Sequence, residues 1–199
     1  LHRDNPDIPV SEFIDALDEV KSEGLINLVG ASNWQLERFS EARDYAKSNN
    51  KEPFTALSNN FSLAEMVDPV WPGCVGVNNE YIKYLIENQI MLYPWSSQAR
   101  GFFIKKKEIT SNEHFSNPSL EEEIRVWHNK KNLERRARCF EIAEQKNLQP
   151  IQVALAYVVQ KSSLIFPLIG PRTIFETNSS IEASQINLSD QEMIDLSIE

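Results

Sequence analysis

The sequence of 199 residues lacks the features that mark membrane-spanning, fibrous and disulfide-rich proteins. It contains only two cysteines and six glycines, and its apolar runs are much shorter than the roughly 20 residues that a membrane-spanning helix needs. Collagen-like and low-complexity structures are excluded by the same composition. Hydrophobic residues make up 41% of the chain, which is enough to form a core. We therefore expect a soluble globular protein.

An excess of positive charge is also lacking, because 20 lysines and arginines stand against 29 acidic residues. The resulting net charge of −9 disfavours nucleic acids and anionic lipid surfaces as partners. The one basic cluster, residues 105–107, is short and typical of a solvated loop. Cys74 and Cys139 lie far apart, without a CxxC motif or metal-ligand spacing. We therefore expect free thiols, no metal site and, without a visible signal peptide, a cytoplasmic protein.

Amphipathic segments alternate with short apolar runs along the chain. Apolar residues at three- to four-residue spacing predict helices, and short apolar runs that enter polar turns predict buried strands. The segment 101–132 is polar and is expected to be a functional loop or a mobile insertion, in which Phe102, Phe103, Phe115 and Trp127 are candidates to line a pocket. The expected strands are 25–29, 54–57, 90–95 and 164–169, and the expected helices are 10–24, 35–48, 79–88, 133–146, 151–161, one ending near 183, and a terminal helix capped by Ser189.

This alternation predicts a parallel sheet covered by helices, because a parallel connection must cross over. The expected strands read as apolar on both faces, which is typical of a fully covered parallel sheet. Leu1 reads as the end of a further strand, so that a polar cluster follows each of five strands. Parallel α/β folds bind ligands at these carboxyl ends. We expect five clusters to converge there: His2, Ser32 with Asn33, Ser58 to Asn60, Trp95 with Ser96, and Gly170 to Arg172.

Two parallel architectures compete at this point. An eight-stranded barrel typically needs about 250 residues, whereas an open doubly wound sheet of five strands would fit the chain as it is. No GxGxxG or GxxxxGK[ST] loop follows any expected strand, however, and this weakens the open sheet. The sequence therefore favours part of a barrel.

Several of these strand ends resemble the aldo-keto reductase family, in the family's order. Residues 1–4 resemble the end of its fourth barrel strand, residues 29–34 its fifth-strand motif and residues 95–101 its seventh. Residues 168–173 resemble the cofactor loop after its eighth strand. The resemblance covers essentially the whole chain. It implies the α/β fold of a (β/α)8 TIM barrel, in which residues 1–199 would be a single partial domain, from the end of strand 4 to strand 8.

The resemblance also implies an oxidoreductase that transfers hydride from NADPH to an aldehyde or ketone. That family uses Asp, Tyr, Lys and His in catalysis, with the Tyr as the proton donor. Only the His is carried over, onto His2, which would orient the carbonyl oxygen; an exposed terminal histidine is the alternative. The Asp, Tyr and Lys would lie upstream of residue 1, so the chain by itself is expected to be inactive. No tyrosine is a convincing substitute, because Tyr81, Tyr84 and Tyr157 fall in expected helices and Tyr93 in an expected strand.

NADP(H) is the implied cofactor. Ser32 and Asn33 match the pair that hydrogen-bonds the nicotinamide carboxamide, a group with both donors and an acceptor. Trp95, beside Ser96, matches the aromatic on which the nicotinamide stacks. A polar turn and a core tryptophan are the alternatives at these positions. The remaining positions match the pyrophosphate loop at Gln98, Arg100 and Gly101, and the 2′-phosphate site at Gly170, Arg172 and Thr173.

Three positions depart from the family pattern. Ser58 stands where the sixth strand usually ends in Gln, and Glu176 and Ser180 stand where the adenine pocket has Gln and Asn. These departures place the details of the cofactor contacts in doubt. The carboxylate of Glu176 would also lower a preference for NADPH, because like charges repel.

Three hypotheses therefore remain. The first is an NADP-dependent aldo-keto reductase acting on a small carbonyl or alcohol. The second is a non-catalytic, nicotinamide-nucleotide-binding regulatory or auxiliary subunit, suggested by the missing Asp, Tyr and Lys. The third is a barrel isomerase or lyase that uses residues 170–173 to bind a phosphorylated substrate. The sequence favours no oligomeric state.

Overall fold

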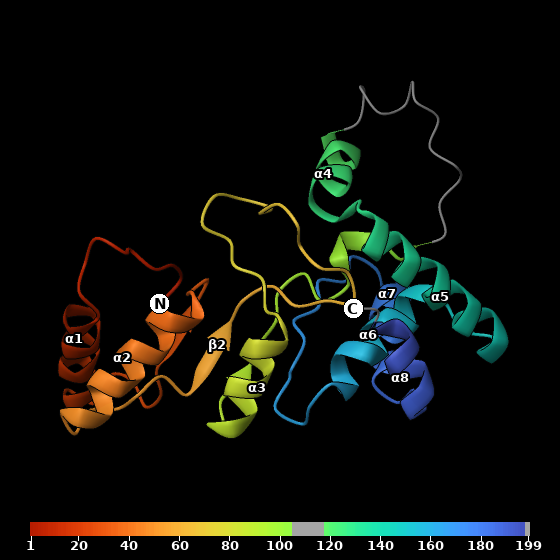
Figure 1. Ribbon diagram of the computed structural model, residues 1–199. Helices are drawn as coiled ribbons and strands as arrows, with labels where there is room; N and C mark the ends of the chain where they lie inside the picture. Colours follow the sequence, from red (N-terminus) through yellow and green to blue (C-terminus); the bar gives the residue numbers. More distant parts are fainter. Residues whose placement is uncertain (105–117, 198–199) are drawn as a thin grey trace.

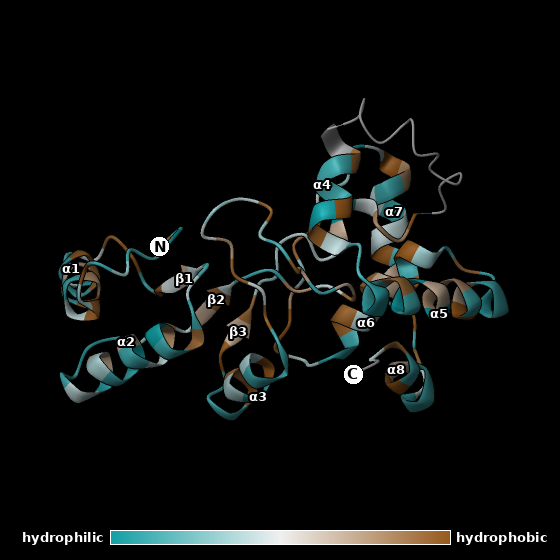
Figure 2. Ribbon diagram, turned by 45° about the horizontal axis from the view of Figure 1, so that its top comes forward, coloured by the Kyte–Doolittle hydropathy of each residue, from teal (hydrophilic) through white to brown (hydrophobic). Residues whose placement is uncertain are grey.

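Three short parallel strands form the centre of the computed structural model, which describes residues 1–104 and 118–197. They are β1 (Gly30–Ser32), β2 (Ala56–Ser58) and β3 (Met91–Leu92), in the order β1-β2-β3. Both neighbouring pairs are parallel. Figure 2 shows the three strands side by side, with α1 and α2 beyond β1. The expected α/β architecture with a parallel sheet is confirmed.

Two single residues extend this sheet at its edges. The carbonyl of Leu1 accepts from the backbone N–H of Ser32 at 2.9 Å, and the terminal amine of Leu1 donates to Gly30 at 2.8 Å. At the other edge, Ile165 forms a parallel bridge with Leu92. Leu1 therefore lies beside β1 as the end of a strand would, as the sequence predicted.

Eight α-helices and one 3-10 turn are found within the described residues. The predicted helices are confirmed to within three residues at the ends that the sequence specified. Asn78, Asn129, Thr173 and Ser189 cap α3, α5, α7 and α8 through their side chains, and Ser189 forms the expected capping box. The helices are α1 (Val10–Ser22), α2 (Leu36–Ser48), α3 (Asn79–Glu87), α4 (Pro118–Trp127), α5 (Lys130–Lys146), α6 (Pro150–Gln160), α7 (Ile174–Ala183) and α8 (Asp190–Leu196), and the 3-10 turn is η1 (Ala99–Gly101).

The helices form two groups along the sheet. Figure 1 shows α1 and α2 near the N-terminus, α3 below the middle of the molecule, and α4 to α8 gathered at the far end. α1 packs against α2, and α6 packs against both α5 and α7. On α2 the predicted apolar face is buried, whereas on α3 Ile86 is 39% exposed and Ile82 packs inward in its place.

Only one face of the sheet is covered, contrary to the expectation of strands buried on both faces. Alternate residues of a strand point to opposite faces. The covered face carries Ala31, Leu57, Leu92 and Ile165, all of them buried. Residues on the other face, among them Gly30, Ala56 and Met91, are half-buried, and Phe166 is 46% exposed. The apolar runs therefore overstated the burial of the residues on this second face.

Two of the expected strands are placed differently. The run 25–29 was expected to be a buried strand, but Leu25 is 69% and Leu28 is 64% exposed, and β1 begins only at Gly30. The run 164–169 contributes a bridge at Ile165 and one backbone hydrogen bond, from Leu168 to Pro94, rather than a full strand. Strand pairing depends on a neighbour at the right register, which an apolar run does not reveal.

The expectation of a loop over 101–132 is partly wrong. α4 begins at Pro118 and α5 at Lys130, while residues 105–117 lie outside the described residues. Phe102, Phe103 and Trp127 are fully buried in the core instead of lining an open pocket. Phe115 lies outside the described residues, as does the basic cluster 105–107. The polar composition of residues 101–132 concealed α4, although Leu120, Ile124 and Trp127 follow a helical spacing.

No helix in the described residues is long and apolar enough to cross a membrane. Both cysteines are free, as predicted, with Cys74 half-buried and Cys139 buried. The Cys139 thiol donates to the carbonyl of Pro150 at 3.0 Å, and burial raises its pKa to about 12.

The two thiols are therefore expected to differ in reactivity, because the thiolate is the nucleophile. Iodoacetamide at pH 8 should alkylate Cys74 in the folded protein and leave Cys139 unmodified, as measured by mass spectrometry of peptides. In denaturant both should react at similar rates, which provides the control. Equal alkylation of the two cysteines in the folded protein would contradict the burial of Cys139.

Candidate functional site

The carboxyl ends of the strands are joined by side-chain hydrogen bonds that run across the sheet. Ser32 ends β1, and its hydroxyl donates to the carbonyl of Ser58 at 2.6 Å. Ser58 ends β2, and its hydroxyl donates to the carbonyl of Tyr93 at 2.8 Å. Both residues were predicted at a cofactor site from sequence, and the structure places them in adjacent strands. Each hydroxyl still has lone pairs that can accept a hydrogen bond from a ligand.

The same pattern continues toward the far edge of the sheet. Asn60 donates through its side-chain amide to the carbonyl of Trp95 at 3.0 Å. Ser97 is buried, and its hydroxyl donates to the carbonyl of Leu168 at 2.8 Å. Polar residues thus hold the end of each strand against the next, and they bring the clusters after β1, β2 and β3 into one row.

Asn33 occupies a special position in this row. Its φ of 57° lies in the left-handed region, which asparagine tolerates better than most residues. Its side-chain amide donates to the hydroxyl of Ser32 at 3.0 Å, and its side-chain oxygen accepts from the backbone of Val75 at 3.2 Å. Only 7% of Asn33 is exposed. The predicted Ser-Asn pair is therefore preorganised, with its two side chains bonded to each other.

His2 lies beside this row but is exposed. Its neighbour Leu1 pairs with β1, which places His2 at the same edge as Ser32. Within the described part of the chain no hydrogen bond or ring contact fixes its imidazole. This position is compatible with both expectations for His2. One is a group that contacts a ligand at the strand ends, and the other is an exposed terminal histidine.

Trp95 and Ser96 begin a tight loop after β3. Trp95 is partly buried, and its indole N–H is shielded from solvent without a hydrogen-bond partner among the described residues. Ser96, Ala99 and Arg100 all have positive φ, between 46° and 49°. Backbone strain of this kind persists only where the surrounding structure holds a loop in one conformation.

The rest of this loop, Gln98 to Gly101, depends on one glycine for its conformation. The amide of Gly101 donates to the carbonyl of Gln98 at 3.2 Å. Gly101 has a φ of 94°, and a Cβ added there would lie 3.1 Å from the side chain of Ile104. The turn therefore needs glycine, for its conformation and for space.

Arg100 is held by two partners that the sequence did not indicate. Its guanidinium Nε lies 3.1 Å from the carboxylate of Glu122 on α4, and the group lies 5.3 Å from the ring centre of Trp71. Its side chain remains 41% exposed. The guanidinium expected at the pyrophosphate is thus paired with Glu122, and a phosphate would compete with Glu122 for it.

The loop before α7 carries the last predicted cluster. Gly170, Arg172 and Thr173 are exposed. The hydroxyl of Thr173 accepts from the backbone of Glu176 at 3.1 Å, and the carboxylate of Glu176 accepts from the backbone N–H of Arg172 at 2.5 Å. Ser180, in contrast, is buried on α7 and is not part of this exposed loop. Glu176 therefore occupies one backbone donor that an anion at this helix end would use.

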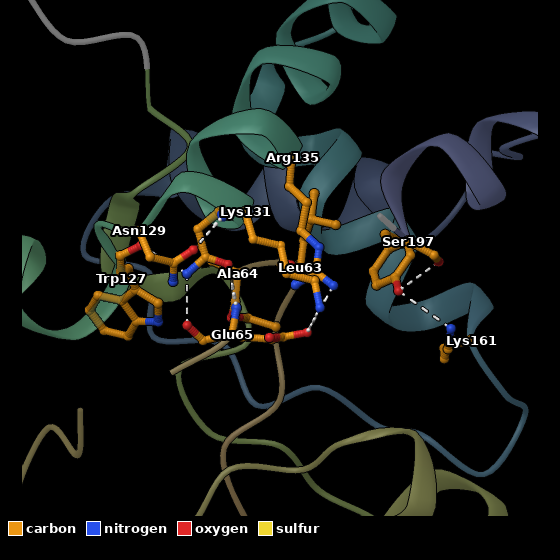
Figure 3. A network of polar contacts seen from close by, with 12 residues as sticks. Leu63, Ala64, Glu65, Trp127, Asn129, Lys131, Arg135, Lys161 and Ser197 are labelled. Carbon is orange, nitrogen blue, oxygen red and sulfur yellow. Dashed lines mark hydrogen bonds and ion pairs between the residues drawn. The ribbon is translucent and has the colours of Figure 1, made fainter. Parts of the chain in front are cut away.

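A cleft of about 540 Å³ lies between the loop after β2 and the helices α5, α6 and α8. Glu65 is its central acid, with Arg135 at 2.9 Å and Lys131 at 3.2 Å (Figure 3). Burial tends to raise the pKa of Glu65, but these two cations more than offset it and the pKa lies below its ordinary value. The cleft was not predicted, because its residues come from elements far apart in sequence.

Tyr157 lies in the wall of this cleft. Its hydroxyl is 3.0 Å from that of Ser197 and accepts from Lys161 at 3.4 Å. It is on α6, and Tyr81 and Tyr84 are on α3, as the sequence predicted. None of these tyrosines lies in the row of strand ends. Within residues 1–104 and 118–197, no three potential metal ligands lie close enough together to hold a metal ion.

Comparison with known proteins connects this geometry to a family. The sequence matches the Aldo/keto reductase family over residues 1–197. It is 25% identical over 187 residues to norsolorinic acid reductase A of Aspergillus parasiticus, an alignment that covers 92% of this chain and 43% of that protein. Versiconal hemiacetal acetate reductase of Aspergillus parasiticus is 23% identical over 195 residues, covering 97% of this chain and 54% of that protein.

The fold is similar to that of a thermostable aldo-keto reductase crystallised with the inhibitor epalrestat. The TM-score is 0.68 at 20% identity, and the match covers 98% of this chain and 57% of that chain. The present chain thus spans about half the length of the curated relatives that it matches. Because the family match extends over nearly every residue, the chain belongs to the Aldo/keto reductase family.

Proposed function

We propose that this chain forms the dinucleotide-binding part of a (β/α)8-barrel reductase that uses NADP(H) to reduce small aldehydes or ketones. The row of strand-end side chains from Ser32 to Ser97 is the observation that carries the proposal. It sets hydrogen-bonding groups and an aromatic ring at the carboxyl edge of a parallel sheet, where α/β folds bind their ligands. Family membership supports the choice of a nicotinamide dinucleotide.

The residues present fit such a cofactor. The preorganised pair Ser32 and Asn33 offers acceptor and donor groups for a carboxamide, and Trp95 offers an aromatic face beside it. When bound, the reduced nicotinamide supplies the hydride. The chain's own residues fix the ring and the phosphates, the phosphates being assigned to Gln98, Arg100 and Gly101 and to Gly170, Arg172 and Thr173.

His2 is proposed to orient the carbonyl oxygen of the substrate. A neutral imidazole can donate one hydrogen bond to an oxygen that gains charge during reduction. Tyr81, Tyr84 and Tyr157 lie on α3 and α6, outside the row of strand ends, so none of them is assigned as the proton donor. Burial raises the pKa of Tyr81 to about 12, and its hydroxyl is hydrogen-bonded to Trp34 and Gln35. The complete reaction therefore needs an acid that these residues do not provide.

The absence of an assigned proton donor favours a second candidate, a nucleotide-binding regulatory or auxiliary protein without turnover. The two candidates share the cofactor site and differ in the acid. Aldehyde-dependent oxidation of NADPH, measured at 340 nm, separates them. Because the 199-residue chain by itself is expected to be inactive in either case, the assay uses the full-length protein: its turnover would favour the enzyme, while tight NADPH binding without turnover would favour the auxiliary role.

Binding of NADPH is tested by titration of the tryptophan fluorescence. We expect saturable quenching, because Trp95 lies at the proposed nicotinamide position. Nicotinamide and adenosine 2′,5′-bisphosphate serve as controls for the two halves of the dinucleotide. The proposal fails when neither NADPH nor NADH changes the emission.

Arg172→Ala is expected to weaken NADPH binding by about tenfold and NADH binding by less than threefold. The guanidinium would pair with the 2′-phosphate, which only NADPH carries. Arg138→Ala is the matched control, because Arg138 is also exposed but lies on α5. Dissociation constants from fluorescence titration provide the measurement. An equal loss for the two dinucleotides would remove Arg172 from the 2′-phosphate site.

A further inference from the structure

The end of β2 is followed by a buried asparagine that the proposed cofactor site does not use. Asn59 comes directly after Ser58, the last residue of β2, and it has no exposed surface. β1 and β2 lie side by side (Figure 2), and the side chain of Asn59 reaches the segment that follows β1. Burying a polar side chain is unfavourable unless its groups are hydrogen-bonded. The partners of Asn59 therefore indicate what its amide does.

The amide of Asn59 pairs with the backbone of a single residue. Its oxygen accepts from the N–H of Trp34 at 3.3 Å, and its nitrogen donates to the carbonyl of Trp34 at 2.9 Å. Trp34 lies between the end of β1 and the first residue of α2. Within the described residues, neither the sheet nor a helix supplies partners for these two backbone groups. The amide of Asn59 thus takes the place of a neighbouring strand at Trp34.

Trp34 directly follows a residue in an unusual conformation. Asn33 has a φ of 57°, and a left-handed residue of this kind persists only where its surroundings hold it. Its backbone N–H donates to the carbonyl of Ser58 at 3.3 Å, and the same carbonyl accepts from the hydroxyl of Ser32 at 2.6 Å. Asn59 holds the next peptide group, through the N–H of Trp34. Two consecutive residues after β2 therefore bind the last residue of β1 and the two that follow it.

The side chain of Asn33 retains groups that a ligand can use. Its amide donates to the hydroxyl of Ser32 at 3.0 Å, and its oxygen accepts from the backbone of Val75 at 3.2 Å. An asparagine side chain has two amide hydrogens and two lone pairs, so one of each remains after these contacts. The remaining hydrogen and lone pair match the oxygen and the amino group of a carboxamide. Their direction depends on the backbone of Asn33, which Asn59 holds through Trp34.

We propose that Asn59 is a positioning residue, which holds Ser32 and Asn33 in the conformation that binds the carboxamide of the nicotinamide. This inference rests on the proposed cofactor site, and it assigns Asn59 no contact with the cofactor. Loss of the Asn59 amide should weaken binding of the nicotinamide half of the dinucleotide. The phosphate half is assigned to the loops at 98–101 and 170–173, so its binding should be almost unchanged.

Binding is measured on the full 199-residue chain by calorimetric titration with NADPH and with adenosine 2′,5′-bisphosphate, which lacks the nicotinamide. Asn59→Ala is expected to weaken binding of NADPH by about tenfold and of the bisphosphate by less than about twofold. Asn132→Ala is the matched control, because Asn132 is also fully buried and bonded to backbone groups but lies on α5. We expect it to change both affinities by the same small factor. An equal loss for the two ligands in Asn59→Ala, or no loss for NADPH, would overturn the proposal.

Asn59→Asp tests the hydrogen bond to the Trp34 carbonyl. A protonated carboxyl group can donate and accept as the amide does, whereas a carboxylate only accepts, and burial raises the pKa of a carboxyl group toward neutrality. The affinity of this variant for NADP⁺, relative to the unsubstituted chain at the same pH, is expected to fall about tenfold from pH 5 to pH 8. Tyr81, whose hydroxyl lies 3.3 Å from the same carbonyl, stays protonated in this range, because burial raises its pKa to about 12. A relative affinity that does not depend on pH would contradict the proposed role.

Amide hydrogen exchange, followed by NMR without ligand, separates failure of this proposal from failure of the cofactor assignment. We expect Asn59→Ala to accelerate exchange at the backbone amides of Asn33 and Trp34 by about tenfold, and Asn132→Ala to leave it nearly unchanged. Unchanged exchange in Asn59→Ala would refute the positioning role, even where the unsubstituted chain binds NADPH. Accelerated exchange without NADPH binding by the unsubstituted chain would refute the proposed function and confirm only the local contact.

Discussion

Trp34→Ala is expected to lower the free energy of unfolding by about 4 kcal/mol, the largest single effect that we predict. Trp34 has no exposed surface, and it packs edge-on against Phe13 at 5.4 Å and Phe54 at 5.3 Å between ring centres. Arg38 lies over the same indole at 5.4 Å. Truncation to alanine removes these contacts and leaves a cavity that the surrounding rings cannot easily fill.

Urea denaturation followed by circular dichroism measures this change. Trp71→Ala is the matched control, because the same side chain is lost from an exposed position, and we expect it to cost less than about 1 kcal/mol. The comparison separates burial from residue type. A loss below about 1.5 kcal/mol for Trp34→Ala would show that the aromatic cluster around Trp34 is looser than the structure indicates.

Asn132→Ala is expected to cost about 3 kcal/mol. Asn132 is fully buried at the start of α5, and its side-chain oxygen accepts from the backbone of Glu65 at 2.9 Å. Its amide donates to the carbonyls of Glu65 and Trp127, both at 2.8 Å. Alanine would leave these backbone groups without a partner inside the protein, and an unsatisfied buried polar group carries its full desolvation cost.

Asn49→Ala provides the control for this second substitution. Asn49 is exposed and donates to the carbonyl of Tyr45 at 2.8 Å, so water can replace the lost bond. We expect a cost of less than about 1 kcal/mol there. Similar losses for Asn132 and Asn49 would contradict the role of Asn132 as the junction between the loop after β2 and α5.

Trp34 and Asn132 connect the stability of the fold to the proposed function. Trp34 follows Asn33 directly, and its backbone exchanges hydrogen bonds with the buried side chain of Asn59 at 2.9 and 3.3 Å. Asn132 fixes the loop after β2 from the opposite side, through Glu65. The ends of β1 and β2, which carry Ser32 and Ser58, are thus held by buried contacts of the core.

Helices were the part of the fold that the sequence predicted best. Their apolar spacing and caps are local signals, and Ser189 with Glu192 forms the expected capping box. α4 was missed although Leu120, Ile124 and Trp127 recur at helical spacing, because the polar composition of residues 101–132 was taken to indicate a loop. Strand positions were less accurate, since residues 25–29 precede the strand that they were taken to form, and pairing depends on residues elsewhere in the chain.

The candidate site was predicted in part. Ser32, Asn33, Ser58 and Trp95 come together at one edge, as expected from their places after apolar runs. The link between Arg100 and Glu122 spans the undescribed segment and has no local signature. In the sequence, Asn60 and Ser97 are only polar residues in predicted turns. Their hydrogen bonds to the neighbouring strand ends are seen only in the structure.

The sequence by itself determined the alternation of strands and helices, the order of polar clusters along the chain and the resemblance to a reductase family. Periodicity, caps and turn residues act over a few neighbouring residues, so they can be read directly. Only the tertiary structure decided which face of the sheet is buried, which hydroxyl bonds to which carbonyl, and that Arg100 lies over Trp71. These contacts join residues that are distant in sequence, and packing of the whole chain sets their geometry.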